Sequence, residues 1–364
     1  MMPRRTVVIA GGGTGGHIYP AIAIARALRE KDPSIEVHFV GTPAGLETKI
    51  IPKEGLPLHL MKIGKLNTGG GLVGKMRTLL GIPKALVQSA ALLMELKPEA
   101  VLGVGGYASG PFVLMAALLG FKATIWEPNA KPGLTNRWLS RFVRRSFVVF
   151  DEAVRELKSR QIVPVGLPVR AEVEKIGEKS MGAVEPDFHV LIFGGSQGAR
   201  AINRILTEVL SLDPAWREGM RFILQTGAYD FAETSKACRN LTNVEVHEYL
   251  HDMDQRYQWA DLVICRSGAS TVAELAAARK PAILVPLPWA ADDHQRKNAE
   301  SLVSQEAAVM VPQKDLTTER LIREILALKN DSQRRARMRE KLQRFHKPQA
   351  AHRIAELMLS PGEA

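Results

Sequence analysis

Glycines, a threonine and a histidine are gathered in residues 11–20, which read GGGTGGHIYP. The stretch follows the apolar run 7–10 and precedes residues 21–28, whose alanines and aliphatic side chains suit a helix packed on a sheet. The pattern predicts a strand, a glycine loop and a helix, in which peptide N–H groups approach an anion at the positive helix end. His17 adds an imidazole, which transfers protons near neutral pH. We therefore expect a phosphate or sugar cradle with a base beside it, and a histidine that caps or packs the helix is the alternative.

The same loop also fits a dinucleotide fingerprint, because Gly11, Gly13 and Gly16 have the spacing G-x-G-x-x-G. A dinucleotide site also needs an acidic residue at the end of the second strand, where it binds the ribose. That strand is predicted over residues 35–40, and the sequence GTP follows it at residues 41–43. The acid is missing, so the glycine spacing alone does not establish a dinucleotide site.

The composition is that of a globular protein with room for two domains. The chain has 364 residues, of which 46% are hydrophobic and 24% charged. Its apolar segment at residues 112–119 is far shorter than the roughly 20 residues that span a bilayer, and the run behind the basic start is too short for a signal peptide. A cytoplasmic protein is expected. Cys238 and Cys265 have no metal-binding spacing, which predicts buried thiols.

The net charge of +11 is concentrated in two stretches without acidic residues, 55–94 and 128–150. No helix-turn-helix, zinc-finger or RNP-like string accompanies them, so a nucleic-acid partner is not expected. In the first stretch cationic and aliphatic side chains are mixed, which suits an anionic membrane surface, although an amphipathic helix with a solvated basic face gives the same pattern. The predicted membrane patch consists of Leu72, Val73, Lys75, Met76, Arg77, Leu79, Leu80 and Lys84.

Strand-like and helix-like segments alternate along the chain, which predicts βαβ units and parallel sheets. A second glycine loop, GGYASGP, occupies residues 105–111, and a later predicted strand ends at Glu127. Residues 164–170 have the prolines and glycine of a domain connection. The opening pattern then starts again, with an apolar run before the loop GGSQGAR at residues 194–200. The predicted fold is α/β with two doubly wound domains, and the basic helical segment 332–359 is expected to pack back on the first domain.

Polar and glycine-rich segments also follow the predicted strands of the second half, where parallel sheets bind ligands. The loop GGSQGAR and Arg170 offer N–H groups, a hydroxyl and a guanidinium to a diphosphate. In CRSGASTVAE, residues 265–274, Glu274 is expected in the first turn of a helix, where it binds a ribose or complements the helix dipole. Asp252 and Asp254 form the D-x-D of some metal-dependent sugar transferases, but we interpret them as a helix cap. No metal site is predicted.

Six motifs occur in a fixed order over almost the whole chain. They are GGTGGH, GGYASGP, LTNRWL, GGSQGAR, CRSGASTVAE and DDHQ. Together they resemble the MurG family of bacterial enzymes, which transfer N-acetylglucosamine (GlcNAc) from UDP-GlcNAc to the 4-hydroxyl of N-acetylmuramic acid in lipid I. The product, lipid II, serves peptidoglycan synthesis and thereby cell shape and division. The resemblance implies a GT-B fold, with two Rossmann-like doubly wound domains facing a central cleft, and an inverting reaction without a catalytic metal or tightly bound cofactor.

The resemblance also implies domain ranges and site residues. Residues 1–165 would form the domain that faces the acceptor and the membrane, residues 166–340 the domain that binds UDP-GlcNAc, and residues 341–364 a helix packed back on the first domain. His17 would be the catalytic base, with Glu127 as the other candidate. The donor-binding residues would be Thr14, Gly15, Gly16, Asn129, Arg170, Ser196, Leu250, Ala269, Ser270, Thr271, Val272, Ala273, Glu274 and Gln295. Among these, the Leu250 backbone would read uracil, Glu274 would bind ribose and Gln295 would bind GlcNAc.

The partners implied by the resemblance are UDP-GlcNAc, the undecaprenyl-linked acceptor and the anionic cytoplasmic face of the inner membrane, where the protein would be peripheral. Two other functions fit the same motifs. One is a UDP-GlcNAc epimerase of the same fold, which needs acidic catalytic residues in place of an acceptor face. The other is a membrane-associated nucleotide-binding scaffold without turnover. Transfer requires one base on the acceptor and fixed positive groups around the UDP leaving group, and the motifs supply both.

Overall fold

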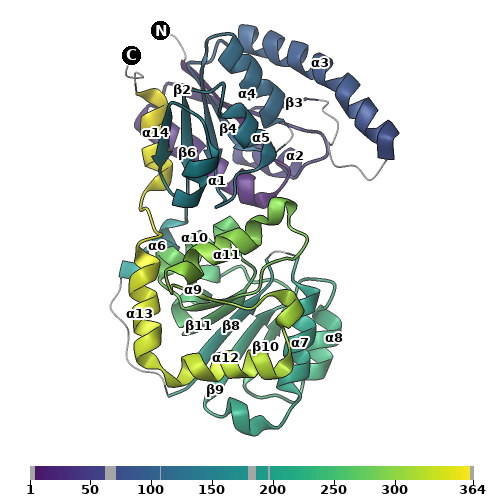
Figure 1. Cartoon of the computed structure of the whole chain (residues 1–364), viewed down its shortest axis with the longest axis vertical. Coiled ribbons are helices and arrows are strands. Elements are labelled where there is room, and N and C mark those ends of the chain that lie inside the picture. The colour runs from purple at the N-terminus through teal and green to yellow at the C-terminus, as the bar shows by residue number, and fades with distance from the viewer. Residues whose placement is uncertain (1–4, 62–70, 107, 179–185, 196, 361–364) are drawn as a thin grey trace. The chain divides into compact units, whose positions relative to one another are not determined.

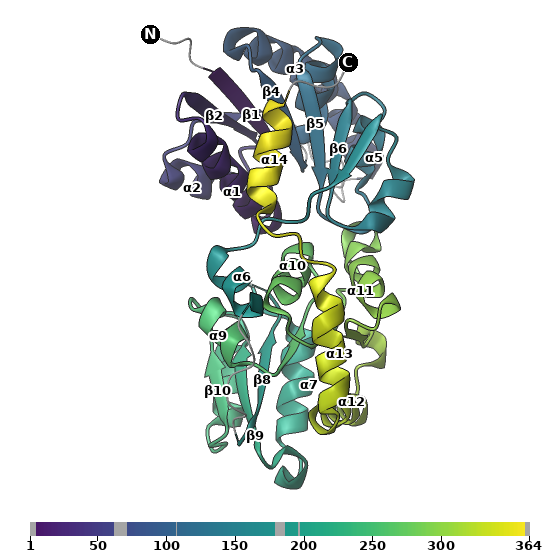
Figure 2. The ribbon, with the colours of Figure 1, turned by 90° about the vertical axis from the view of Figure 1, so that its left-hand side faces the viewer.

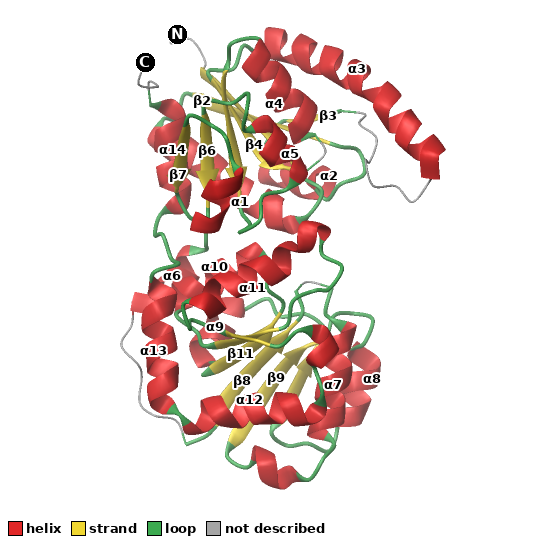
Figure 3. Cartoon of the chain, viewed as in Figure 1, coloured by secondary structure: helices red, strands yellow, loops and turns green. Residues whose placement is uncertain are grey.

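A computed structural model describes residues 5–61, 71–106, 108–178, 186–195 and 197–360, without the side chains of residues 71–80. The chain divides into two compact units. Unit 1 consists of Met1–Pro168 and Gln349–Ala364, and unit 2 consists of Val169–Pro348. Each unit is a parallel sheet covered by helices, which confirms the predicted α/β class (Figures 1 and 3).

The sheet of unit 1 has seven strands among the described residues, in the order β3-β2-β1-β4-β5-β6-β7, and all of its pairs are parallel. The strands are β1 (Arg5–Gly11), β2 (Ile35–Gly41), β3 (Leu58–Leu60), β4 (Ala100–Gly105), β5 (Lys122–Glu127), β6 (Arg145–Val148) and β7 (Gln161–Pro164). In the register of β1, Val7 pairs with Val37 on one side and with Ala100 on the other. β7 closes the sheet immediately before the predicted domain connection.

Helices cover both faces of this sheet. They are α1 (Gly15–Lys31), α2 (Glu47–Ile50), α3 (Gly71–Leu96), α4 (Ser109–Leu118), α5 (Leu134–Leu139) and α14 (Ala350–Leu359), with the 3₁₀ helices η1 (Ile51–Glu54) and η2 (Asp151–Glu156). α3 packs against α4 and α4 packs against α5, so these three helices form a connected layer. α14 packs against α1, as Figure 2 shows, and Nε2 of His352 on α14 lies 2.9 Å from a carboxyl oxygen of Glu30 on α1.

The basic segment 332–359, predicted as one helical stretch, is two helices that belong to different units. α13 (Ser332–Gln343) stays in unit 2 because Met338 is part of that unit's core. α14 belongs to unit 1, and the chain turns between the two helices at Gln349, whose φ of 54° is left-handed. Unit 2 therefore ends at residue 348 rather than 340. It also begins at residue 169 rather than 166.

Unit 2 repeats the architecture with six strands among its described residues, in the order β10-β9-β8-β11-β12-β13. The strands are β8 (Phe188–Phe193), β9 (Met220–Gln225), β10 (Val244–His247), β11 (Leu262–Cys265), β12 (Ala282–Leu284) and β13 (Val309–Met310). The helices besides α13 are α6 (Ala171–Glu178), α7 (Arg200–Leu210), α8 (Phe231–Cys238), α9 (Met253–Trp259), α10 (Ala269–Ala278), α11 (His294–Ser304) and α12 (Thr318–Asn330), with the 3₁₀ helices η3 (Pro214–Arg217), η4 (Ala291–Asp293) and η5 (Gln313–Asp315). This strand order is the one found in dinucleotide-binding sheets.

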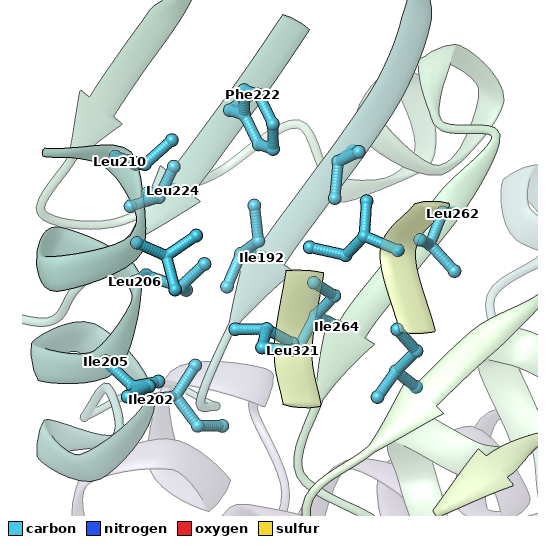
Figure 4. Packing of buried hydrophobic residues seen from close by; sticks show 14 of the residues in the cluster. Ile192, Ile202, Ile205, Leu206, Leu210, Phe222, Leu224, Leu262, Ile264 and Leu321 are labelled. Carbon is cyan, nitrogen blue, oxygen red and sulfur yellow. The ribbon is translucent and has the colours of Figure 1, made fainter. Parts of the chain in front are cut away.

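The core of unit 2 follows from the sequence periodicity. β8 is buried along its whole length, as expected of a central parallel strand with helices on both faces. On α7, Ile202, Ile205 and Leu206 recur at helical spacing, and Figure 4 shows them beside Ile192 and Leu224 of the sheet. Each such aliphatic side chain contributes roughly 1.5–3 kcal/mol when fully buried. The packing fixes the strand ends from which the functional loops leave.

Each sheet has a point where the strand order reverses. In unit 1, β1 lies between β2 and β4, and in unit 2, β8 lies between β9 and β11. Ligands of open parallel sheets bind at the carboxyl ends of the strands at this point. In unit 1 the two glycine loops follow β1 and β4. In unit 2 the loop GGSQGAR follows β8 and the segment RSGAST follows β11, so each unit brings two of the predicted motifs together.

Candidate functional site

The two glycine loops of unit 1 touch through their backbones. The N–H of Gly12 donates to the carbonyl oxygen of Gly105 over 3.3 Å. A Cβ on Gly11 would lie 2.3 Å from that oxygen, and a Cβ on Gly106 would lie 2.6 Å from the carbonyl oxygen of Gly12. Only glycine fits at these contacts, so the loops form one continuous surface at the end of the sheet.

α1 begins at Gly15, directly behind the first glycine loop, with Thr14 as its N-cap residue. The N–H groups of Gly15 and Gly16 have no acceptor within the helix because they belong to its first turn. His17 is half-buried in this turn, and its Nδ1 lies 3.4 Å from the hydroxyl oxygen of Thr14. Its Nε2 lies 3.2 Å from the position that a Cβ on Gly105 would take. The imidazole thus lies where the two loops meet, and His17 is not the helix cap.

Glu127 ends β5, and only 2% of its surface is exposed. Its Oε1 accepts hydrogen bonds from the backbone and side-chain N–H groups of Asn129. Its Oε2 accepts from the N–H of Gly133 and from the side-chain amide of Asn136. Burial raises the pKa of Glu127, and these four donors oppose the rise. The carboxyl group therefore organises the loop between β5 and α5 and sets the position of Asn129.

Glu47, the first residue of α2, is a second buried acid and one that no sequence pattern singles out. It is 2% exposed, and its Oε2 accepts from the N–H of Gly13 over 2.7 Å. Its Oε1 accepts from the N–H and the hydroxyl of Thr42, over 2.8 and 3.0 Å. No acid follows β2 directly, but α2 folds back so that this carboxylate reaches the end of β2. Both of its oxygens are buried and bonded, so it does not offer itself to a ribose.

The glycine loop of unit 2, which joins β8 to α7, also interlocks with its neighbour. Gly198 has a φ of +77°, and a Cβ on it would lie 1.8 Å from the carbonyl oxygen of Thr226. Gln225, at the end of β9, donates from Nε2 to the carbonyl oxygen of Gly195 over 2.8 Å. The Gln225 amide thus binds the loop at a carbonyl oxygen, and no described N–H group of the loop donates to it. Ser196, predicted to hold phosphate, lies outside the described residues.

Gln225 also reaches Leu250, and the sequence pattern does not reveal this link. Its Oε1 accepts from the backbone N–H of Leu250 over 3.1 Å. The Leu250 side chain is buried, so only its peptide groups can meet a ligand. Because the N–H is in use, the carbonyl oxygen is the group left for the predicted contact with uracil.

α10 presents the second helix start of unit 2. The N–H groups of Ala269, Ser270 and Thr271 have no acceptor within the helix, since they form its first turn. The N–H of Val272 donates to the carbonyl oxygen of Gly268, and the side chains of Val272 and Ala273 are buried. Within the predicted segment, residues 269–271 are thus the ones whose N–H groups could meet an anion, while Val272 and Ala273 belong to the core side of the helix.

Glu274 lies in the second turn of α10 rather than in the predicted first turn, because the helix begins at Ala269. The helix dipole does not explain a carboxylate there, since its effect fades beyond the first turn. The hydroxyl of Tyr257 donates to Oε2 over 3.0 Å, and the Arg170 guanidinium lies 3.5 Å from Oε1. Burial raises the pKa of Glu274, while Arg170 and Tyr257 oppose the rise. The carboxylate is oriented from two sides, and 23% of the side chain remains exposed.

Gln295 is tied to the loop before α10. Its Oε1 accepts from the N–H of Leu287 over 3.0 Å, and its carbonyl oxygen accepts from the Ser267 hydroxyl over 2.8 Å. The side chain of Asn298 donates to the Ser267 carbonyl oxygen. These bonds bring the DDHQ segment and the start of α10 together, as the combined motifs predict. The side-chain amide N–H groups of Gln295 are its remaining donors.

The aspartates of the D-x-D sequence lie at the start of α9. Asp252 occupies the N-cap position as predicted, but its side chain makes no cap hydrogen bond and pairs with Arg256 over 2.9 Å. This contact lowers the pKa of Asp252. Within the described parts of the chain, no three His, Cys, Asp or Glu residues are grouped so that they could hold a metal ion. Cys238 and Cys265 are free and buried, which confirms that prediction.

The predicted membrane patch lies on the first part of α3. Residues 71–80 are helical, and the side chains of Leu72, Val73, Lys75, Met76, Arg77, Leu79 and Leu80 lie outside the description, whereas Lys84 is exposed. No described helix is long and apolar enough to cross a bilayer. A hollow elsewhere in unit 1 is lined by Arg141, Phe142, Val143, Arg144, Lys158 and Arg160. Beside it, Trp138 is 50% exposed, with its ring centroid 5.0 Å from that of Phe142.

Comparison with family models assigns both units. Residues 7–148 match the glycosyltransferase family 28 N-terminal domain, and residues 189–354 match the glycosyltransferase family 28 C-terminal domain. A relative from Bdellovibrio bacteriovorus is 52% identical over 99% of this chain and 100% of its own length. That relative is named UDP-N-acetylglucosamine–N-acetylmuramyl-(pentapeptide) pyrophosphoryl-undecaprenol N-acetylglucosamine transferase.

Solved structures agree with this assignment. The crystal structure of Acinetobacter baumannii MurG matches with a TM-score of 0.79 at 30% identity, over 97% of this chain and 99% of that one. A UDP-GlcNAc 2-epimerase from Neisseria meningitidis matches with a TM-score of 0.65 over 98% and 99% of the two chains, but at 13% identity. The likeness to the epimerase is a likeness of fold alone.

Proposed function

The chain belongs to the MurG family of N-acetylglucosamine transferases within glycosyltransferase family 28, and we propose how its two units share the reaction. The reaction moves GlcNAc from UDP-GlcNAc to the N-acetylmuramyl-(pentapeptide) pyrophosphoryl-undecaprenol acceptor, lipid I, and gives lipid II for peptidoglycan. UDP-GlcNAc is the donor substrate, and no cofactor is required. The assignment of single residues to steps, and the docking on a membrane, are our proposals.

Unit 2 binds the UDP part of the donor. The observation that carries this proposal is the Glu274 carboxylate, which Tyr257 and Arg170 orient one helical turn beyond the unpaired N–H groups of residues 269–271. A ribose presents two neighbouring hydroxyls that both donate to one carboxylate, and a diphosphate is the natural ligand of a helix N-terminus. Arg170 and Ser196 hold phosphate, the Leu250 carbonyl accepts from uracil, and Gln295 donates to the GlcNAc hydroxyls.

Unit 1 supplies the base and the acceptor surface. His17 takes the proton from the acceptor 4-hydroxyl while that oxygen attacks C1 of GlcNAc and the bond from C1 to the UDP oxygen breaks, with inversion at C1. Thr14, Gly15, Gly16 and Asn129 line the sugar and the diphosphate. Glu127 is 2% exposed and both of its oxygens accept hydrogen bonds within the β5–α5 loop, so it is not free to meet an acceptor hydroxyl, and this geometry favours His17 as the base.

Unit 1 also docks on the anionic inner face of the membrane. The sequence of α3 combines aliphatic and cationic residues, and α3, α4 and α5 form one connected layer. Arg141, Lys158 and Arg160 add exposed cations, and Trp138 adds an exposed ring of the kind that lies at headgroup level. Each juxtamembrane cation is worth about 1 kcal/mol at such a surface. The apolar and cationic residues together give reversible binding.

Transfer is tested by incubating the protein with UDP-GlcNAc, with and without a short-chain, water-soluble lipid I analogue. The proposal expects UDP release that depends on the acceptor, together with a disaccharide product. A new free UDP-sugar formed without acceptor is the result of an epimerase, and binding without either product is the result of a scaffold. Either outcome rejects the proposed division of the reaction.

Membrane docking is tested by sedimentation with vesicles that contain anionic phospholipid. Arg141→Glu/Lys158→Glu and Leu79→Glu/Leu80→Glu should each lower vesicle binding on the order of 10-fold or more, while turnover of the soluble acceptor stays intact. Binding of the unaltered protein should fall with salt, since exposed charges are screened over about 8–10 Å. The matched control is Arg204→Glu/Lys236→Glu, which makes the same charge change on α7 and α8 of unit 2. Equal losses in the control and the unit 1 variants would reject a specific docking face.

A further inference from the structure

Three glycines from separate segments surround the Glu47 carboxyl group. A Cβ on Gly12, Gly41 or Gly45 would lie 2.6, 2.6 or 1.9 Å from a side-chain atom of Glu47. The glycines thus leave a space that the carboxyl group fills at the junction of the first glycine loop, the end of β2 and the turn before α2. The three glycines enclose the carboxyl group of Glu47 so closely that it has one orientation available.

Both carboxyl oxygens of Glu47 accept hydrogen bonds. Oε2 accepts from the backbone N–H of Gly13, while Oε1 accepts from the N–H and the hydroxyl of Thr42. The donors to Glu47 are uncharged. Hydrogen bonds from neutral donors to a carboxylate are short and about twice as strong as those between neutral groups. The carboxylate therefore ties the glycine loop to the end of β2.

The glycine loop that Glu47 holds is followed directly by His17, the proposed base. Gly13 has a φ of +91°, which only glycine adopts without strain, and the next residue is the N-cap Thr14. The Thr14 hydroxyl lies 3.4 Å from Nδ1 of His17 in the first turn of α1. The bond from Gly13 to Glu47 is thus one residue from Thr14 and fixes the point at which the loop enters the helix.

We propose that Glu47 is a positioning residue for the transfer reaction, holding the first glycine loop so that Thr14 and His17 meet the acceptor hydroxyl. This inference rests on the proposed role of His17. Glu47 touches no substrate, since its oxygens are buried and bonded within unit 1. Its effect is on the geometry of the reacting groups, where a displacement of about 1 Å costs about 100-fold in rate.

Glu47→Gln is the sharpest variant because it keeps the shape and removes one acceptor. With the amide oxygen facing the two donors of Thr42, the amide NH₂ group faces the N–H of Gly13, and the loop is released. Gly45→Ala should also release the loop, because the added Cβ displaces Oε2 of Glu47 while the charge of the carboxylate stays intact. The control is Glu54→Gln, which removes a half-buried carboxylate that pairs with Arg26 on α1.

The measurements are kcat and KM for a soluble acceptor, UDP affinity by calorimetry, and the midpoint of thermal unfolding. Glu47→Gln and Gly45→Ala should each lower kcat by about 10- to 100-fold, with UDP affinity within two-fold of the unaltered protein. Glu54→Gln should leave kcat and KM unchanged. A lowered unfolding midpoint with unchanged kcat per folded molecule, in either loop variant, would make Glu47 a purely structural acid and overturn the proposal.

A double variant tests whether Glu47 acts through His17. In the His17→Ala background, Glu47→Gln should change the residual rate by less than two-fold, because groups that act as one unit are not additive. A further loss equal to that of the single variant overturns the proposal. A His17→Ala protein that retains full activity would instead reject the proposed function. The activity of this single variant is therefore measured before the double variant is made.

Discussion

The two units build the same glycine loop at the same place in the sheet, but they hold it by opposite groups. In unit 1 the carboxylate of Glu47 takes the N–H of Gly13. In unit 2 the neutral amide of Gln225 donates to the carbonyl oxygen of Gly195. One loop therefore has a negative group bonded to a peptide N–H, whereas Gln225 binds the other loop at a carbonyl oxygen and brings no charge to it.

This difference bears on two tasks, binding of the diphosphate and transfer of the proton, because the shared fold alone would allow either task at the glycine loop of either unit. A loop with a buried carboxylate against it repels a phosphate at Gly13, and what remains to it is the helix start with its histidine. A neutral amide that holds the loop of unit 2 by a carbonyl oxygen sets no negative charge against an anion, and Arg170 adds a cation in the same unit. The topology thus provides two equivalent strand ends, and the side chains that hold each loop agree with the proposal that unit 2 binds most of the UDP and that unit 1 supplies the base.

The largest effect should come from the base. His17→Ala should lower kcat by about 10²- to 10⁴-fold, the range that a general base contributes, while the affinity for UDP stays within a few-fold. Transfer to a soluble acceptor measures the first quantity, and calorimetric titration with UDP measures the second. His352→Ala, which removes an exposed histidine of unit 1, is the matched control.

A His17→Ala protein with half its activity would remove this residue from the mechanism and return attention to Glu127. A large loss of UDP affinity would contradict the proposed division of tasks between the two units. It would mean that the loop of unit 1 carries the nucleotide as well as the base.

In unit 2 we expect substitutions to weaken UDP binding, and this effect should be smaller than the loss of kcat in His17→Ala. Glu274→Ala should weaken UDP binding by roughly 1.5–3 kcal/mol, the range for hydrogen bonds to a charged group. Tyr257→Phe, which removes one of the two contacts that orient this carboxylate, should weaken UDP binding by roughly 0.5–1.5 kcal/mol, typical of one hydrogen bond. Calorimetric titration with UDP measures both losses. Unchanged affinity in Glu274→Ala would leave the carboxylate with a structural role only.

The sequence reveals the loops better than the residues that hold them. Strand, glycine loop and helix are local patterns, so the motifs at residues 11–17 and 194–200 fall where the periodicity predicts. Glu47 and Tyr257 act on segments far along the chain, and their roles depend on how α2 and α9 pack, which no local pattern encodes. The available signal for Glu47 was the glycine at 41 directly after the second strand, together with the one at 45.

The errors at helix boundaries have a similar cause. Glu274 falls in the second turn because α10 starts at Ala269. Asp252 is the N-cap residue as predicted, but the sequence does not reveal that its side chain pairs with Arg256 and makes no cap hydrogen bond. Residues 332–359 are basic and favour helix along their length, so composition does not reveal that the chain turns at Gln349 and that α13 stays in unit 2, while α14 packs on unit 1 as predicted. Such breaks depend on which core each helix can bury its apolar face against.

The smallest expected effect is a dependence of donor binding on pH. Burial raises the pKa of Glu274 above the ordinary value of 4.5, and the ionised form is the one that accepts from both ribose hydroxyls. Affinity for UDP-GlcNAc should therefore fall as the pH is lowered through the raised pKa, beginning at a higher pH than an ordinary glutamate would allow. Below this pKa the limiting slope is tenfold per pH unit.

The ligand for this experiment is UDP-GlcNAc rather than UDP, because its diphosphate is esterified at both ends and does not titrate in this range. Calorimetry between pH 4.5 and 8 should also show proton release on binding. Glu274→Gln should bind more weakly and without this slope, and a variant with the slope of the unaltered protein would assign the titration to another group.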